Sequence, residues 1–343
     1  ACFSVRVCIQ YSDKHMAQLL LIYNGMFSLN KYCFEKETVK MKNVKVILWG
    51  LGAMGGGIGK MLTKKKGVDI VGAIDIGDKI GKSLYDVVPG IVRGDREDVI
   101  VGTPEEVIKP GAADIVVVCT NSFTKDVYDK LVFVMEKGMN VITSAEEMAY
   151  PQAQEPELAK KLDEIAKKNG VSVMGTGINP GLIMDLLVIL WTAACEEVNH
   201  VTSRRVNSLS PFGPAVMEEQ GIGISVEEFN ERKANGTMAG HVGFAESTMM
   251  ICDALGWKWD DFGQDMEPIV TDVDRKSPYG FAAAGQVAGV AMKGWVNIDG
   301  ERKIDMDHPQ QIEPEQVGVH TGDYVILDSV PPVNMVNTPE IEG

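Results

Sequence analysis

The first half of the chain alternates short apolar runs with amphipathic stretches. The apolar runs have the length and composition of strands buried on both faces of a parallel sheet, and they cover residues 44–49, 69–76, 99–101, 113–119, 141–143 and 171–174. Between them, apolar side chains recur at helical spacing, most clearly over 156–169, where Leu158, Leu162 and Ile165 share one face. Strands that alternate with helices predict an α/β domain with a doubly wound parallel sheet, which we assign to residues 41–174.

The second half of the chain, residues 175–343, has a different pattern. A turn-rich cluster, Gly175 to Gly181, precedes an apolar helix predicted over 182–194, and further helices are predicted over 226–232 and 239–255. A loop over the cleft is predicted at 210–223, and strands are predicted at 198–208, 268–273, 284–296, 301–306 and 323–328. Because few helices separate these strands, parallel crossovers are scarce. We therefore predict a second α+β domain whose open sheet is mainly antiparallel.

A glycine-rich turn follows the first predicted strand. The motif Gly50-x-Gly52-x-x-Gly55 leads into a helical pattern that continues through Met61 and Leu62. A strand, a glycine turn and a helix N-terminus are typical of a Rossmann-type dinucleotide site, in which the glycines permit the turn, admit the pyrophosphate and allow close packing. A glycine-rich turn in another kind of α/β protein is the alternative. The residues of this turn that we predict to bind the cofactor are Gly50, Leu51, Gly52, Ala53, Met54 and Gly55.

Asp75 is the candidate partner of the adenosine ribose. It ends the second predicted strand, at about the 20-residue distance from the glycine turn that is typical of a ribose-binding carboxylate, and this favours NAD. Lys79 and Lys82 follow it, and either could accept the additional phosphate of NADP or simply remain solvated. The predicted cofactor is therefore NAD or NADP.

Two further pairs of residues are predicted to contact the cofactor. Thr120 and Asn121 stand at the carboxyl end of strand 113–119, where open parallel sheets bind their ligands, although they could instead cap the next helix. Asn179 and Pro180 lie in the turn cluster between the two halves and are expected to face the nicotinamide. The alternative for Asn179 and Pro180 is that they only form the turn between a strand and a helix.

Two adjacent carboxylates follow the strand at 141–143. Glu146 and Glu147 leave the sheet beside the expected nicotinamide, where a carboxylate can stabilise a cationic transition state or activate water. An acidic first turn of a helix, favoured by the helix dipole, explains the same pair without catalysis. We treat both glutamates as candidate catalytic residues.

The candidate substrate ligands come from the second half of the chain. Arg204, Arg205 and Asn207 lie on the predicted strand 198–208, and a guanidinium is a natural partner for a substrate carboxylate. A structural ion pair is the alternative for either arginine, because the protein is acidic. His308 stands at the end of a predicted strand and is either a site residue or a hydrogen-bonded structural histidine.

Composition and charge narrow the class of protein. The chain has 343 residues, 45% hydrophobic and 24% charged, which suits a globular protein with two cores. Its formal net charge of −15 argues against nucleic acid and anionic membranes as partners, and no apolar run reaches the ~20 residues of a membrane span. Six scattered cysteines suit a reducing cytoplasm, and the five histidines have no ligand-like spacing, so we expect no metal site.

The two ends of the chain carry expectations of their own. Residues 1–40 precede Met41, and the first strand begins almost directly after it, so we expect an upstream leader that is disordered or foreign to the folded protein. A short amphipathic arm is the alternative. The chain stops soon after Asn337 without a closing helix, and we expect the second domain to be cut short there.

Several motifs together resemble the 2,4-diaminopentanoate dehydrogenases and the native amine dehydrogenases, which share one fold and a first domain similar to that of dihydrodipicolinate reductase. The resemblance runs from Met41 to the end of the chain. The motifs that carry it are VITSAEE with Tyr150-Pro151, GTGINPGLIMD, RRVNS, DHPQQIEP at 307–314 and HTGDYVILDSVPP at 320–332.

The resemblance implies an activity and an assembly. The implied reaction is the NAD(P)-dependent oxidative deamination of 2,4-diaminopentanoate, or a related amine, to the ketone and ammonia, reversible as reductive amination and part of ornithine degradation. Related amine dehydrogenases hold a glutamate beside the imine carbon, and by resemblance it falls on Glu146 or Glu147. Arg204 or Arg205 would hold the substrate carboxylate. A homodimer through the antiparallel sheet is also implied.

Three alternatives stay open from the sequence. Dihydrodipicolinate reductase would carry an H-H-x-x-K signature, and homoserine dehydrogenase would place a lysine at position 146, where this chain has Glu146. A non-catalytic dinucleotide sensor would bind NAD(H) without amine-dependent reduction.

Overall fold

The structure is a computed structural model that describes residues 42–238 and 240–341. Residues 43–343 form one compact unit of the chain. The leader expected at 1–40 lies outside the described residues.

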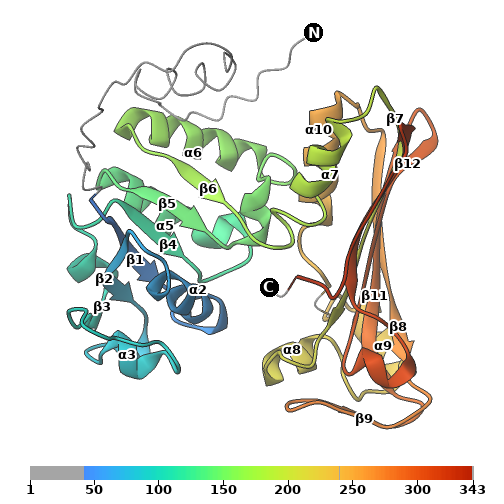
Figure 1. Cartoon of the computed structure of the whole chain (residues 1–343), viewed down its shortest axis with the longest axis horizontal. Helices are drawn as coiled ribbons and strands as arrows, with labels where there is room; N and C mark the ends of the chain where they lie inside the picture. The colour runs from blue at the N-terminus through green and yellow to red at the C-terminus, as the bar shows by residue number, and fades with distance from the viewer. Residues whose placement is uncertain (1–41, 239, 342–343) are drawn as a thin grey trace, which may run out of the picture. The chain divides into compact units, whose positions relative to one another are not determined.

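The first sheet has six strands, all parallel, in the order β3-β2-β1-β4-β5-β6 (Figure 1). This is the strand order of a Rossmann fold, with the change of direction between β1 and β4. The strands are β1 (Val44–Trp49), β2 (Val68–Ile74), β3 (Val101–Gly102), β4 (Ile115–Val118), β5 (Asn140–Thr143) and β6 (Val173–Gly175).

Helices cover both faces of this sheet, and each face has its own buried core. The core on one face packs α5 and α6 against the central strands, and the core on the other face packs α2 and α3. The predicted doubly wound α/β fold is therefore confirmed. The helices are α2 (Ala53–Thr63), α3 (Leu84–Val87), α4 (Pro104–Val107), α5 (Thr124–Glu136) and α6 (Pro156–Asn169), with short 3-10 turns η1 (Gly77–Lys79) and η2 (Glu146–Ala149).

Helix α6 has the bounds that its sequence pattern predicts. Pro156 occupies the first turn, where its missing N–H is not needed, and Gly170 ends the helix in the left-handed conformation with φ of 65°. Ala159, Leu162 and Ala166 are buried on one face, at the helical spacing seen in the sequence.

The second sheet also has six strands, in the order β14-β13-β7-β12-β11-β8. Every neighbouring pair is antiparallel except β7 and β12, which are parallel. The prediction of a mainly antiparallel sheet is therefore confirmed. Its strands are β7 (Glu197–Ser208), β8 (Asp261–Val270), β11 (Val287–Ile298), β12 (Glu301–Gln311), β13 (Gly322–Val330) and β14 (Val333–Asn337). A separate two-stranded sheet joins β9 (Arg275–Lys276) to β10 (Phe281–Ala282).

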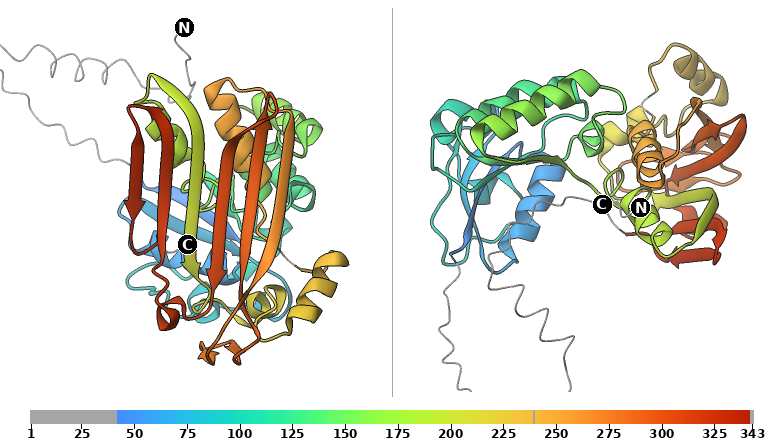
Figure 2. Two further views of the ribbon diagram at one scale, coloured as in Figure 1. Left: turned by 90° about the vertical axis from the view of Figure 1, so that its right-hand side faces the viewer. Right: turned by 90° about the horizontal axis from the view of Figure 1, so that it is seen from above.

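One face of the second sheet carries the core, and the other is open. Figure 2 (left) shows the strands facing the viewer with the helices behind them. Strand β7 illustrates the alternation, because Val201, Ser203 and Arg205 are buried whereas Arg204 is exposed. The remaining elements are α7 (Leu186–Thr192), α8 (Pro214–Glu219), α9 (Val226–Ala234), α10 (Phe244–Leu255) and η3 (Pro314–Val317).

Two helix predictions need correction. The helix predicted over 182–194 is confined to Leu186–Thr192, because the buried carboxylate of Asp185 binds the N–H groups of Gly181 and Leu186 and so starts the helix late. The helix predicted from 239 begins at Phe244; residue 239 itself lies outside the described residues. The loop predicted at 210–223 contains helix α8, which has Pro214 in its first turn.

Strand β12 is longer than predicted, and this matters for the site. The prediction ended at Met306, but the strand continues through Pro309 to Gln311. Its inward positions change from apolar Ile304 and Met306 to polar His308 and Gln310, because the strand passes from the core to a polar cavity. The hydrophobic pattern therefore stops before the strand does.

Candidate active site

The glycine turn has the geometry that a dinucleotide site needs. Gly50 has φ of +96°, and a Cβ atom on it would lie 2.4 Å from the carbonyl oxygen of Cys119. A Cβ on Gly55 would lie 1.7 Å from the carbonyl oxygen of Gly50, so helix α2 packs directly on the turn. At Gly52, by contrast, a Cβ would meet nothing within 4 Å, which leaves its backbone open to a ligand. No side chain caps the start of α2, and its first turn holds no acidic residue, so its N–H groups suit a pyrophosphate.

Asp75 lies beside this turn at the end of β2. Its carboxylate accepts hydrogen bonds from the backbone N–H of Leu51 at 2.7 Å and of Ile76 at 2.8 Å, and it pairs with the ammonium of Lys79 at 2.8 Å. Burial opposes ionisation of Asp75, but the hydrogen bonds from Lys79 and the two amides outweigh burial and hold its pKa below the usual value. Asp75, which favours NAD, and Lys79, which could bind the additional phosphate of NADP, thus form one ion pair.

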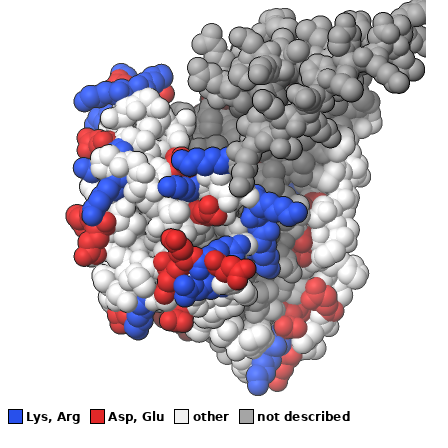
Figure 3. All heavy atoms as spheres, turned by 60° about the vertical axis from the view of Figure 1, so that its left-hand side comes forward, with Lys and Arg blue, Asp and Glu red and all other residues white. Residues whose placement is uncertain are grey.

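The surface around the nucleotide domain mixes both signs of charge. Figure 3 shows lysines and arginines lying among aspartates and glutamates on this face. Exposed pairs such as Lys82–Asp78 at 3.0 Å contribute little to stability, because water and salt screen them.

Thr120 and Asn121 lie at the carboxyl end of β4, as the sequence indicates. Both accept hydrogen bonds from the ammonium of Lys130, at 2.9 and 2.6 Å respectively. Neither caps helix α5, because the N–H of Thr124 donates instead to the carboxylate of Glu147 at 2.7 Å. The two residues remain predicted cofactor contacts.

The structure separates the two candidate glutamates. Glu147 is only 7% exposed, and its carboxylate is turned toward the start of α5, which it caps. Glu146 is half-buried and lines a cavity. The carboxylate available to a ligand is therefore that of Glu146.

This cavity has a volume of about 740 Å³, and both sheets contribute to it. The strand ends of the first sheet supply Ser122, Ser144 and Glu146. The crossover contributes Gly177, Ile178, Asn179 and Pro180, and the second half of the chain contributes Arg205, Asn207, Phe212, Val216, Glu219, Gln220, Gly236, Thr237, Met238, Gly240, His241, Val242, His308 and Gln310.

Asp185 anchors the end of the turn cluster Gly175 to Gly181. Its buried carboxylate accepts hydrogen bonds from the N–H of Gly181 at 2.7 Å and the hydroxyl of Ser247 at 2.9 Å. Asn179, bonded to Pro180 through a cis peptide, has both side-chain polar atoms buried and without a partner among the described residues. A cavity-lining amide in this state is suited to a ligand that both donates and accepts.

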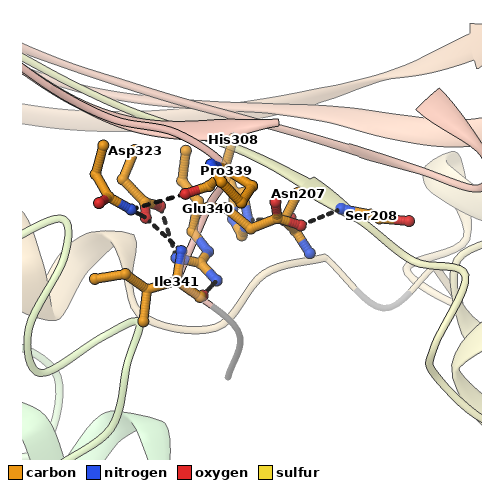
Figure 4. A network of polar contacts seen from close by, with 9 residues as sticks. Asn207, Ser208, His308, Asp323, Pro339, Glu340 and Ile341 are labelled. Atoms are coloured by element: carbon orange, nitrogen blue, oxygen red, sulfur yellow. Dashed lines mark hydrogen bonds and ion pairs between the residues drawn. The ribbon is translucent and has the colours of Figure 1, made fainter. Parts of the chain in front are cut away.

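The two candidate arginines lie on opposite faces of β7. Arg204 is half-exposed, pairs with Asp307 at 2.9 Å and lies over the ring of Tyr324, away from the cavity. Arg205 lines the cavity and is buried, with hydrogen bonds to the carboxylate of Asp323 and the carbonyl oxygen of Ile341, both at 2.7 Å. Figure 4 shows the network in which Asp323 and the segment Pro339–Ile341 meet. Only Arg205 therefore lies where a substrate carboxylate could reach it.

Asn207 and His308 meet in the same wall of the cavity. The side-chain oxygen of Asn207 lies 2.9 Å from Nε2 of His308, which is 4% exposed. Burial, followed by the neighbouring His241 and the charge of Arg205, lowers the pKa of His308 well below its usual value.

His241 is a cavity-lining residue that the sequence prediction missed. Its ring lies 4.8 Å from the ring of His308, edge to face, and burial together with Arg205 lowers its pKa to about 4. Because the helix was predicted to start at 239, His241 was placed inside a helix rather than in the loop before Phe244. The glycines at 240 and 243 on either side of it were the available signal.

The described residues contain neither a metal-binding cluster nor a membrane-spanning helix. No group of three or more His, Cys, Asp or Glu residues in that part of the chain could hold a metal ion. None of the helices there is long and apolar enough to span a membrane.

The comparison with curated proteins decides the family. The chain is 68% identical to a 2,4-diaminopentanoate dehydrogenase of Acetoanaerobium sticklandii over 304 residues, which cover 88% of this chain and 86% of the relative. The chain belongs to the 2,4-diaminopentanoate dehydrogenase family. A model of the family's C-terminal domain matches residues 182–343. The alternatives of dihydrodipicolinate reductase, homoserine dehydrogenase and sensor are not favoured.

Solved structures agree with this family. An amine dehydrogenase from Mycobacterium smegmatis matches with a TM-score of 0.73 and 25% identity, over 86% of each chain. A putative myo-inositol dehydrogenase from Sinorhizobium meliloti matches with a TM-score of 0.52 and 14% identity, over 86% of this chain and 76% of that one, and so shares the fold alone. The chain is thus an oxidoreductase of the dehydrogenase type, with the fold of enzymes that bind a nicotinamide cofactor.

Proposed function

We propose that this protein oxidises the amine on carbon 4 of 2,4-diaminopentanoate with NAD(P)+ and water, giving 2-amino-4-oxopentanoate, ammonium, the reduced cofactor and a proton. The reverse reaction is a reductive amination. The observation that carries this proposal is the 68% identity, over most of both chains, to a 2,4-diaminopentanoate dehydrogenase. The cavity between the glycine turn and the second sheet supports it, since an amino acid and a nicotinamide ring require such a joint space.

The residues that would hold the dinucleotide are those of the first sheet and the crossover. The N–H groups of α2 and the open backbone at Gly52 would bind the pyrophosphate. Asp75 would accept hydrogen bonds from the adenosine ribose, and this favours NAD, although Lys79 beside it offers a partner for the additional phosphate of NADP. Thr120, Asn121, Asn179 and Pro180 would contact the cofactor nearer its reactive end. When bound, the nicotinamide supplies the hydride acceptor.

Glu146 is the proposed catalytic residue. Its half-buried carboxylate lines the cavity, whereas the carboxylate of Glu147 is engaged with Thr124. With the carbon-4 amine bound in its neutral form, the carboxylate of Glu146 would stabilise the positive charge that develops on the substrate at carbon 4 and then take a proton from the attacking water. Glu147 would act as a positioning residue for η2 and α5.

Arg205 is the proposed ligand of the substrate carboxylate, with Asn207 and His308 beside it. Two of its donors are already engaged, but a guanidinium has five N–H groups and keeps others for a ligand. Arg204, on the other face of β7, is the less suitable of the two predicted arginines.

We further propose a cytoplasmic homodimer that acts in ornithine degradation. The open face of the second sheet presents Tyr324, Ile326 and Val336 next to one another, and Ile326 and Val336 are 41% and 49% exposed. An apolar group of this kind suits a self-complementary interface. A monomeric mass by light scattering would contradict the assembly.

The experiment that tests the function is a spectrophotometric assay of cofactor reduction. The protein is mixed with NAD+ or NADP+ and then with 2,4-diaminopentanoate or a simple amine. We expect reduction with 2,4-diaminopentanoate and a loss of at least ~100-fold in kcat for Glu146→Gln, but a smaller loss for Glu147→Gln. If no amine-dependent reduction of the cofactor is seen, the proposed reaction is refuted. If Glu146→Gln does not slow turnover, the proposed role of Glu146 is refuted.

A further inference from the structure

Buried polar atoms without partners gather on one wall of the cavity. They are Nε2 of His241, Nδ1 of His308 and both polar atoms of the Asn179 side chain, and none has a hydrogen-bond partner among the described residues. All three side chains line the cavity. Buried polar groups are normally paired, so a group of unpaired ones in a cavity indicates the position of a polar ligand.

The bond to Asn207 decides what the His308 ring offers to that ligand. A side-chain carbonyl oxygen can only accept, so Nε2 of His308, 2.9 Å from it, must carry the hydrogen. The ring is neutral in its buried position beside Arg205. In a neutral ring with its hydrogen on Nε2, the second nitrogen has a lone pair. Nδ1 of His308 is therefore an acceptor and requires a donor on the ligand.

The charges around the cavity favour a cationic donor. The charged side chains that line it are Glu146, Arg205 and Glu219. The charge of Arg205 is balanced by Asp323, which is fully buried. Neither Glu146 nor the exposed Glu219 forms an ion pair with another described residue, so a ligand with an excess of ammonium groups complements them.

We propose that Nδ1 of His308 accepts a hydrogen bond from the carbon-2 ammonium of the substrate, so that His308 determines specificity for a 2-amino acid over a simple amine. This proposal rests on the proposed function and assigns a residue to one group of its substrate. Asn207 and His241 are positioning residues, because Asn207 holds the tautomer and His241 packs its ring against that of His308. Glu146 serves the other amine, on carbon 4.

The test compares two ligands that cannot be oxidised at carbon 4. 2-Aminopentanoate carries both the ammonium and the carboxylate, and pentanoate carries only the carboxylate. Their affinities for the NAD+-saturated protein are measured by calorimetry in the wild type, in His308→Gln and in His200→Gln. The glutamine in His308→Gln can donate an N–H to Asn207, and its carbonyl oxygen then lies on the side of the former Cδ2, so that no acceptor remains at the place of Nδ1. His200 is the control because it pairs with Asp305 and does not line the cavity.

We expect His308→Gln to weaken 2-aminopentanoate at least about 10-fold and pentanoate less than about 3-fold, because a hydrogen bond to a charged group is lost only in the first case. His200→Gln should change neither. The proposal would be overturned if His308→Gln weakened the affinity for both ligands equally, or if it did not weaken the affinity for 2-aminopentanoate. It would also be overturned if the wild type bound 2-aminopentanoate no more tightly than pentanoate.

A second measurement does not depend on the variant. In the wild type, the 15N signal of His308 should show Nδ1 without a proton, and it should shift with 2-aminopentanoate but not with pentanoate; a protonated Nδ1 would overturn the proposal. If 2-aminopentanoate binds through His308 but 2,4-diaminopentanoate is not oxidised, the reaction is wrong and the ammonium site stands. If oxidation proceeds in His308→Gln with an unchanged KM, the ammonium site is wrong and the reaction stands.

Discussion

The buried ion pair between Arg205 and Asp323 makes the sharpest prediction about stability. The side chains are 7% and 0% exposed, and the carboxylate accepts hydrogen bonds from Arg205 at 2.7 Å and from the N–H of Ile341 at 2.8 Å. The substitution Asp323→Asn removes the negative charge and turns one acceptor into a donor. Whichever way the amide is oriented, its NH2 group faces either the guanidinium or the Ile341 N–H.

The expected cost follows from this geometry. One charge-assisted hydrogen bond is lost and Arg205 is left without its counter-charge, which together lower the free energy of unfolding by about 3–5 kcal/mol. The matched control is Asp307→Asn, because Asp307 on β12 pairs with Arg204, which neighbours Arg205 on β7 but lies on the opposite, more exposed face of the sheet. Water screens that pair, so its loss should cost less than about 1 kcal/mol.

The assay is urea unfolding followed by circular dichroism, with the midpoint and slope recorded for wild type and both variants. Similar midpoints for Asp323→Asn and Asp307→Asn would refute the reasoning, since burial would then make no difference to the two pairs.

Three further predictions follow from other parts of the structure. Gly55→Ala should destabilise the fold, because its Cβ would lie 1.7 Å from a carbonyl oxygen, whereas Gly52→Ala should unfold like wild type but bind NAD+ more weakly in calorimetry. Hydrogen bonds hold the pKa of Asp75 below its usual value, so the stability advantage of wild type over Asp75→Asn should be present at pH 6 and disappear as the pH falls below 3.8; an advantage that persists at low pH would contradict this. Burial raises the pKa of Glu246, so Glu246→Gln should gain stability relative to wild type as the pH rises above 4.5, and a constant difference in urea midpoint would count against it.

The nucleotide-binding half could be predicted closely because its signals are local. The glycine turn, the position of Asp75 and the bounds of α6 each depend on the backbone requirements of neighbouring residues. The second half was predicted less well at its polar positions. The strand through His308 was ended too early because inward-facing polar residues do not continue a hydrophobic pattern.

The sequence by itself determined the class of fold, the presence of a dinucleotide turn and the short set of carboxylates, arginines and histidines from which a site could be built. Only the tertiary structure showed that Glu146 and Arg205 line the cavity whereas Glu147 and Arg204 are turned away from it, and it added His241 to the lining. The physical reason is that neighbouring residues on a strand or turn point in opposite directions. Which direction faces the cavity depends on the packing of segments that are more than a hundred residues apart in the chain, as Asn207 and His308 are.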